Sequence, residues 1–522
     1  MDDFLKRHAS AVEGVISGFD RLIFRGVLRS INYARGLDKF LGAHHIALKD
    51  FSSFVRQSTA TLAEHAQQTA LRAGRPYVYL PSAGTRKDEY AREIAERDAL
   101  TTGLVCVLAV VEPCQTADLA YDRERRLLRV VYRLRKCRFF YFYYLDREFG
   151  LIHVRLQSWL PFDLQVYVNG RLYLAQQLER EGIAFERRHN GFLHIEDYAR
   201  AQVLLDRLVT RAWAPTLNVF AERVNPLLKP LGLTGEYGYY WTIRESEVAT
   251  DVIFRDSAAL QKVYPALTRH ALAYFDSRDV IRFLTGRSNG ALPKQVGTSF
   301  RRRVEGVRIK HSINENALKM YDKEGRILRI EMTINAPRRF RVLRRRHGVL
   351  KWDKMAKGIR DIARRAQVSL AANHRYLEAL AVVGEPTPSH RILDAVSQPV
   401  TRDGRRYRAL RPVSPEESRL LEAILAGEGF VDGFTNRHVQ DRLFPEAPRT
   451  PQEARRRAGY VSRKLRLFRV HGLLTKVSGR NLYRLKPHGH LVATTALAFR
   501  RTDLALLKFA EQNVCKTACS AR

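Results

Sequence analysis

The spacing of apolar positions along the chain changes from helical to strand-like at about residue 103. Before that point apolar residues mostly recur at helical spacing, with amphipathic stretches at 53–73 and 87–97. One short apolar stretch, at 20–28, is typical of a strand. We therefore expect residues 1–100 to form a mainly helical N-terminal region.

Residues 101–383 have the pattern of a sheet with helices. Apolar runs of strand length, separated by turn-forming residues, lie at 104–111, 127–133, 138–145, 151–159, 164–168 and 238–243, and further strands are expected within 296–343. Helical spacing is found at 172–180, 196–229 and 257–286. This order indicates an antiparallel sheet with surrounding helices, which is the α+β class.

Two predicted hairpins in this body have similar sequences, one at 144–154 and the other at 320–330, where an Asp-Lys-Glu-Gly turn connects the strands. A duplicated sheet module, occupying 101–195 and 236–345, would explain the similarity. Shared turn chemistry explains it equally well. The sequence leaves both explanations open.

The C-terminal part follows a proline- and glycine-containing stretch, 384–413, that is typical of a linker. Ser414 and Pro415 are suited to the start of a helix, and further helices are expected from 434 to 443 and from 450 to 470. Two short strands follow around the basic turn at Arg480. Residues 501–522 are expected to form a tail.

This order of helix, helix, basic helix, hairpin and helix over 414–500 resembles the winged helix-turn-helix domains of MarR-like bacterial regulators. The resemblance implies that the third helix enters the major groove of duplex DNA and that the hairpin tip touches the DNA backbone or minor groove. By this resemblance the candidate DNA contacts are Arg456, Arg463, Lys464 and Arg480. Arg455 and Arg466 of the same basic helix are further candidates for nucleic-acid binding.

The charge of the chain points to the same kind of partner. The 522 residues contain 90 Lys and Arg against 54 Asp and Glu, a formal net charge of +36. Residues 294–366 carry a net +15 and residues 401–522 a net +14. Such self-repulsion is expected when a polyanion is the working partner.

Arginine dominates these segments, and guanidinium groups bind phosphate bidentately and stack on bases. The arginine triplets outside the C-terminal region are Arg301, Arg302 and Arg303, and Arg344, Arg345 and Arg346. We expect a nucleic-acid-binding protein of the kind carried by mobile genetic elements. The choice between DNA and RNA and the oligomeric state stay open.

Cysteine usage and the apolar runs argue against a zinc-binding, secreted or membrane-spanning protein. The 5 cysteines are scattered without the paired spacing of a zinc site, which indicates reduced thiols. The N-terminus lacks a secretory signal pattern, and the longest apolar run, 104–111, is far shorter than the roughly 20 residues of a membrane span. We expect a soluble cytoplasmic protein without a membrane partner.

The aromatic strand 138–144 carries rings on both faces, so one face could stack on unpaired bases while the other packs inward. Tyr141 and Tyr143 are the candidates for stacking, with Arg155 on the next strand as a candidate phosphate contact. Core packing alone is the competing explanation of these rings.

One short segment suggests catalysis. Lys319-Met320-Tyr321-Asp322-Lys323, followed by Leu328-Arg329-Ile330-Glu331, resembles a stretch in replication initiators of filamentous phages and plasmids. In related nicking enzymes two histidines separated by one apolar residue bind a divalent metal, and a tyrosine attacks the phosphodiester. The nearest equivalent here is His153-Val154-Arg155, which lacks the second histidine.

Carboxylates offer a second route to a metal site. Side chains that could gather around Mg²⁺ are Glu112, Asp146, Asp163, Glu245, Glu247, Asp251 and Glu331. The candidate catalytic set is Glu112, Asp146, His153, Tyr321 and Glu331. A pure binding protein would need no cofactor, whereas a nuclease, transposase or replication initiator would need Mg²⁺. A third alternative is an RNA-binding component of a ribonucleoprotein.

Overall fold

The computed structural model describes residues 1–81, 85–286, 295–346, 349–381, 383, 389–425, 433–477 and 481–501, apart from the side chains of Arg346, Leu350 and Arg501. The chain divides into two compact units. The sheet unit comprises Ala11–Gln261 and Ser299–Asn373. The C-terminal unit comprises Met1–Ser10, Lys262–Thr298 and His374–Arg522.

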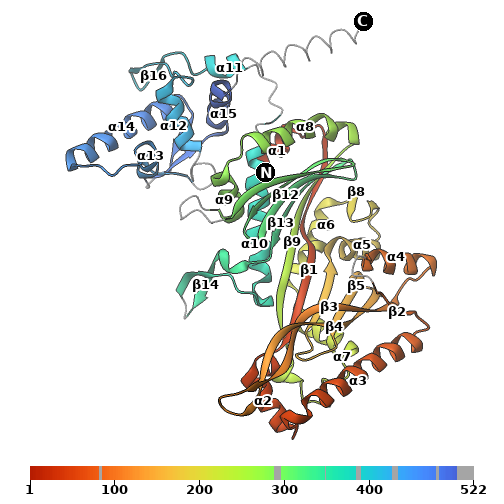
Figure 1. Cartoon of the computed structure of the whole chain (residues 1–522). Helices are drawn as coiled ribbons and strands as arrows, with labels where there is room; N and C mark the ends of the chain where they lie inside the picture. Colours follow the sequence, from red (N-terminus) through yellow and green to blue (C-terminus); the bar gives the residue numbers. More distant parts are fainter. Residues whose placement is uncertain are drawn as a thin grey trace. The chain divides into compact units, whose positions relative to one another are not determined.

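The sheet unit is built on one large, mostly antiparallel sheet (Figure 1). Its strand order is β10-β11-β12-β13-β9-β1-β6-β5-β4-β3-β2. The strands are β1 Val12–Leu28, β2 Tyr77–Tyr79, β3 Gly103–Asp122, β4 Leu127–Asp146, β5 Gly150–Gln157, β6 Leu164–Asn169, β9 Tyr239–Phe254, β10 Val296–Arg303, β11 Gly306–Ile313, β12 Asn316–Lys323 and β13 Ile327–Ile334. Within the described residues, only the β2–β3 pair is parallel. The expected antiparallel sheet with helices is confirmed.

Strand β1 joins the two parts of this sheet. It lies between β9 and β6, so the two sheet modules considered from the sequence are halves of one continuous sheet. The N-terminal hundred residues also differ from the helical region that we expected, because β1 is 17 residues long and belongs to this sheet. Only its second half had a strand pattern, because the first half contains Gly14 and Gly18, where Tyr198 and Leu205 of the helix at 198–210 pack closely.

Helices cover the two faces of the sheet. Helix α4 (Lys87–Arg97) packs on the face of β3–β5 that carries Tyr141 and Tyr143. Helices α3 (Phe51–Arg72) and α7 (Trp213–Val224) contribute to the core on the opposite face. Helix α6 (Tyr198–Thr210) lies against β1, where Gly18 is required because a Cβ there would lie 2.6 Å from Leu205 Cδ2.

The remaining helices and strands complete the two units. They are α1 Asp2–Arg7, α2 Ala34–Ala43, α5 Gly170–Glu181, β7 Phe185–Arg188, β8 Gly191–Ile195, α8 Ser257–Ala273, α9 Ser277–Thr285, β14 Arg341–Arg346, β15 Val349–Lys354 and α10 Ile362–Leu380. Among the described residues, no helix has both the length and the apolar character needed to cross a membrane.

The C-terminal unit contains the predicted helices and hairpin. They are α12 Pro415–Leu425, α13 Asn436–Leu443, α14 Pro451–Val470, β18 Leu474–Lys476, β19 Tyr483–Leu485 and α15 Pro487–Arg501. Phe434 makes an isolated antiparallel bridge to Tyr483, with N···O distances of 2.7 Å in both directions. This bridge adds a third strand position beside the β18–β19 hairpin.

The stretch predicted as a linker is partly folded. It contains α11 (Ser389–Asp394) and the β16–β17 hairpin (Val400–Arg402 and Arg405–Tyr407). Ile392, Val396 and Leu410 are buried in the same core as α12, α14 and α15. The few apolar residues lack periodicity, so the sequence pattern did not predict that they pack onto a neighbouring core.

Candidate functional site

Polar side chains lie side by side across the middle of the large sheet. Side chains at paired positions of antiparallel strands lie on the same face. Lys319 of β12 pairs with Glu331 of β13, and Thr333 of β13 pairs with Glu247 of β9. The register therefore places Lys319, Glu331 and Glu247 on one face.

A β-bulge in β1 completes this group. Phe19 pairs with Val248 and Arg21 pairs with Glu247, so Asp20 is an extra residue between two paired positions. A bulge interrupts the strict alternation of side chains and redirects one of them. Asp20 and Arg21 consequently both reach the face that carries Glu247.

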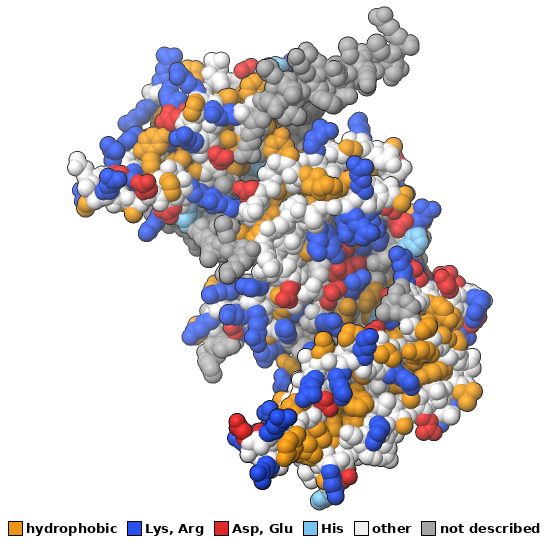
Figure 2. Space-filling view, in the orientation of Figure 1, with side chains coloured by type: hydrophobic (Ala, Val, Ile, Leu, Met, Phe, Trp, Pro, Cys, Tyr) orange, Lys and Arg blue, Asp and Glu red, His pale blue; other side chains and the backbone are white. Residues whose placement is uncertain are grey.

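The result is an acidic cluster of Asp20, Glu247 and Glu331. One carboxylate oxygen of each residue lies within 4.8 Å of the others. The three side chains are only 6%, 6% and 3% exposed. Figure 2 shows acidic side chains gathered at the middle of the sheet, with Lys and Arg side chains around them. Within the described part of the chain no other group of three potential ligands converges in this way.

Basic side chains neutralise the acidic cluster. Lys319 Nζ lies 2.8 Å from Glu247 Oε1 and 2.6 Å from Glu331 Oε1. Arg21 Nε lies 3.5 Å from Glu247 Oε2. Burial alone would raise the pKa of Glu331, but the charges of Lys319 and Arg329 outweigh it and lower this pKa to about 2. Burial and the charge of Glu331 raise the pKa of Glu247.

A fully buried ion-pair network adjoins the acidic cluster at Asp20. Arg329 Nη2 lies 2.8 Å from Asp251 Oδ2, and Arg329 Nη1 lies 3.2 Å from Asp20 Oδ1. Arg171, at the start of α5, donates to Asp251 Oδ2 at 3.0 Å. Asn190, in the β7–β8 turn, donates to Asp20 Oδ1 at 2.8 Å. Because buried charges are costly unless paired, this network fixes the position of Asp20.

The cluster has the donor set of a divalent-cation site. Hard cations such as Mg²⁺ and Ca²⁺ bind carboxylate oxygens, and three oxygens within 4.8 Å can share one ion. The ammonium of Lys319 contacts two of these three carboxylates, so a bound cation would compete with it. Cation binding would therefore be coupled to displacement of the Lys319 side chain.

Glu112 and His153 belong to a second polar cluster, which is formed by side chains of β3, β4 and β5. Glu112 accepts hydrogen bonds from the Tyr141 hydroxyl at 2.9 Å and from Arg155 Nη2 at 2.7 Å. Arg155 and its neighbour Lys87 outweigh burial and lower the pKa of Glu112. His153 stacks on the Tyr167 ring, with centroids 4.9 Å apart. Arg155, which we considered as a phosphate contact, therefore forms an ion pair with Glu112.

Tyr141 and Tyr143, which we considered as stacking platforms for bases, are 8% and 1% exposed. They share a core with Ala91 and Ile94 of α4. The Tyr143 hydroxyl donates to Asp88 at 2.7 Å. Helix α4 covers this face of the sheet, so the core-packing explanation describes these rings and the stacking explanation does not.

The five candidate catalytic residues do not form one site. Asp146 accepts from the backbone N–H groups of Glu148 and Phe149, so it caps the β4–β5 turn. Only Tyr321 and Glu331 are in contact, through a hydroxyl-to-carboxylate hydrogen bond of 2.7 Å. Burial and the charge of Glu331 raise the pKa of Tyr321 well above its usual value. Of the seven carboxylates that we considered as Mg²⁺ ligands, Glu247 and Glu331 lie close together, in the acidic cluster.

Asp20 was missed by the sequence reasoning. A signal was present, because Asp20 is a single acid inside the apolar run Val15-Ile16-Ser17-Gly18-Phe19-Asp20-Arg21-Leu22-Ile23-Phe24. An ionisable residue in the interior of a buried strand must be paired or bound, which makes it a candidate for a site.

The predicted nucleic-acid contacts fall into two groups. Exposed arginines are Arg301, Arg302 and Arg303 on β10, Arg345 on β14, and Arg455, Arg456, Arg463 and Arg466 on α14. Arg344 is engaged in ion pairs with Asp361 and Asp353, and Lys464 lies 2.8 Å from Glu416 of α12. Arg480 and the Arg346 side chain lie outside the described residues.

No family model, curated protein or solved structure matches this chain.

Proposed function

We propose that this protein binds nucleic acid and that α14 is the principal contact. The observation that carries the proposal is the arginine face of this helix. Arg456, Gly459, Arg463 and Arg466 recur at spacings of three and four residues, so they lie along one side of the helix. The three arginines are exposed, and Gly459 accommodates the Arg463 guanidinium, since a Cβ there would lie 3.4 Å from Arg463 Nη1.

The opposite side of α14 is a core face, since Val461, Leu465 and Phe468 are buried. Asn436 at the start of α13 donates to Ser462 Oγ at 2.7 Å, which fixes α13 against α14. With the β18–β19 hairpin and the Phe434 bridge, this arrangement supports a winged helix-turn-helix. In such domains the third helix reads the major groove, which is the role that we propose for α14.

Lys464 is removed from the set of contacts that we propose. Its ammonium lies 2.8 Å from Glu416 Oε1 and 4.0 Å from Glu417 Oε1. A lysine held by two acids contributes less to phosphate binding than an unpaired one, because binding would first have to break these pairs.

The test is a salt titration of duplex DNA binding by the full chain. Each phosphate contact contributes about 0.9 to the slope of log K against log salt. Replacing both Arg456 and Arg463 with alanine should reduce this slope by about 2 and erode discrimination between sequences. Arg391→Ala/Arg402→Ala is the matched control, because both arginines are exposed in the same unit, on α11 and β16.

Unchanged affinity and slope in the double variant would contradict the role of α14. Purification of the full chain without nuclease, followed by sequencing of the nucleic acid that remains bound, identifies whether DNA or RNA is held. A bound RNA in place of DNA would favour the ribonucleoprotein alternative.

A second candidate function rests on the acidic cluster of the sheet unit. Convergence of Asp20, Glu247 and Glu331 favours metal-dependent cleavage of phosphodiesters, since a divalent cation held there would polarise a phosphate oxygen. Asp20→Asn should abolish Mg²⁺-dependent cleavage of DNA. Glu112→Gln should retain it, because Glu112 belongs to the other polar cluster. Cleavage that persists in EDTA would contradict this candidate.

A further inference from the structure

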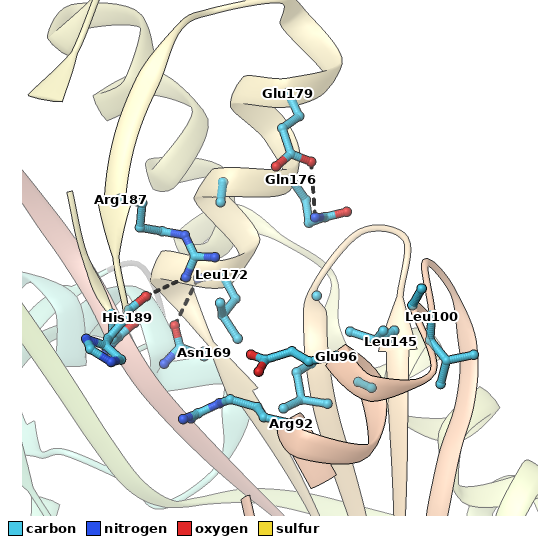
Figure 3. Close-up of a pocket in the computed structure, with 16 residues that line it drawn as sticks. Arg92, Glu96, Leu100, Leu145, Asn169, Leu172, Gln176, Glu179, Arg187 and His189 are labelled. Atoms are coloured by element: carbon cyan, nitrogen blue, oxygen red, sulfur yellow. Dashed lines mark hydrogen bonds between the residues drawn. The ribbon is translucent and has the colours of Figure 1, made fainter. Parts of the chain in front are cut away.

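The sheet unit contains a cavity of about 640 Å³ between helices α4 and α5 (Figure 3). The β4–β5 turn forms one wall and the β7–β8 turn another. Binding sites for small molecules commonly enclose roughly 300–1,000 Å³. The cavity therefore has room for one nucleotide.

The inner wall of the cavity is apolar. Leu145 and Leu151 come from the β4–β5 hairpin, Leu172 and Ala175 from α5, and Ala95 from α4. Gln176 of α5 adds a side-chain amide to the lining and is held by Glu179 at 3.3 Å. An apolar wall with a few polar groups is suited to a flat aromatic base, which has apolar faces and polar edges.

The rim carries two guanidinium groups. Arg92 of α4 and Arg187 of β7 both line the cavity, and both are exposed. Arg187 is held by a hydrogen bond to the His189 carbonyl oxygen. Burial lowers the pKa of Arg187, and the charge of Arg92 lowers it further, whereas the charge of Glu179 raises it. An anion beside Arg92 and Arg187 would meet two cations, and the carboxylates of Glu96 and Glu179 also line the cavity.

The cavity adjoins the acidic cluster through a single residue. Asn190 lines the cavity and also donates to Asp20 Oδ1 at 2.8 Å. Asn169 lines the cavity as well and accepts the N–H groups of Arg171 and Leu172, which fixes the start of α5. A ligand in the cavity is thus separated from Asp20, one of the three carboxylates, by the Asn190 side chain.

We propose that this cavity holds one unstacked nucleotide of a nucleic-acid strand. Its base lies against Leu145, Leu151 and Leu172, and its phosphate lies between Arg92 and Arg187. The nucleotide then positions the adjoining phosphate beside Asp20. This inference rests on the proposed nucleic-acid binding and names a single-strand site in the sheet unit, separate from α14.

The probe is a 12-nucleotide single strand that contains one 2-aminopurine, a base whose fluorescence rises when it is unstacked. Binding of the full chain is followed by anisotropy of an end label, and unstacking by 2-aminopurine emission at saturating protein. The wild-type chain should bind and increase the emission several-fold. In the Arg92→Ala/Arg187→Ala variant the affinity should fall about tenfold and the emission gain by half or more.

Gln176→Phe fills the cavity without changing charge, and it should lower the emission gain while affecting affinity less. Arg129→Ala/Arg133→Ala is the charge-matched control, because both are exposed residues in the far part of β4, and Arg129 lies roughly 50 Å along the strand from Leu145. This control should behave as the wild type. Circular dichroism confirms that each variant is folded.

Strand binding without any emission gain would overturn the cavity proposal and leave nucleic-acid binding intact. The same conclusion follows if the emission gain is unchanged in both the arginine variant and Gln176→Phe. If the wild-type chain binds neither this strand nor duplex DNA, the proposed function fails together with the inference.

Discussion

Lys319→Met is the most informative perturbation of the acidic cluster. The substitution keeps an unbranched four-atom stem and removes the ammonium that contacts Glu247 at 2.8 Å and Glu331 at 2.6 Å. Asp20, Glu247 and Glu331 then face one another within 4.8 Å with less compensating charge. We expect a large loss of stability that a divalent cation can restore.

The magnitude follows from these distances. At an effective dielectric constant of about 20, two unit charges 2.7 Å apart attract by about 6 kcal/mol. Desolvation of the ammonium, several kcal/mol in a buried site, offsets much of the two attractions. Removing one partner of a buried ion pair costs about 3–5 kcal/mol, and we expect this range for Lys319→Met in EDTA.

The assay is urea denaturation of wild type and variant, each in EDTA and in Mg²⁺ or Mn²⁺. A cation that binds only the folded state stabilises it by about 2.7 kcal/mol at one hundred times its Kd. The gain should be larger in the variant, because the cation no longer competes with Lys319. Lys39→Met, at an exposed position of α2 in the same unit, should change stability by less than about 0.5 kcal/mol.

Two results would refute this reasoning. One is a loss of less than about 1 kcal/mol for Lys319→Met in EDTA, which would mean that the three carboxylates are not held together as the register places them. The other is an equal response of both proteins to divalent cations, which would mean that the cation does not occupy the position of the ammonium.

Three further predictions concern other parts of the molecule. The Cys114 and Cys137 sulfur atoms lie 2.7 Å apart, so diamide should couple them into a disulfide that peptide mass spectrometry detects; two free thiols after treatment would contradict this. Glu331 has a pKa of about 2 in the folded protein, below the roughly 4.3 of an unfolded chain, so its contribution to stability is present above that value and lost as the pH falls toward 2. The urea midpoint of the wild type should therefore drop more steeply than that of Glu331→Gln between pH 5 and 3, and equal slopes would oppose this assignment. A fragment of residues 389–501 should unfold at higher temperature than one of 414–501, because only the longer fragment contains the buried residues of α11; equal melting temperatures would show that those residues add nothing to the core.

The sequence by itself determined most elements and their order. Helices α12, α13 and α14 begin at residues whose capping chemistry is local: Ser414 and Pro415, Thr435, and Thr450. The hairpins of the sheet follow from short apolar runs around turn residues, which is also local information. The arginine face of α14 was visible for the same reason, since helical spacing alone places its residues on one side.

Tertiary structure decided which residues share a site. Asp20, Glu247 and Glu331 come from strands far apart in the sequence, and they meet because β1 is inserted between β9 and β6 and because a bulge redirects Asp20. Tyr141 and Tyr143 lie on a face that could have been open, and packing of α4 closes it. Strand order, bulges and helix packing depend on contacts between distant segments, so spacing along the chain does not carry them.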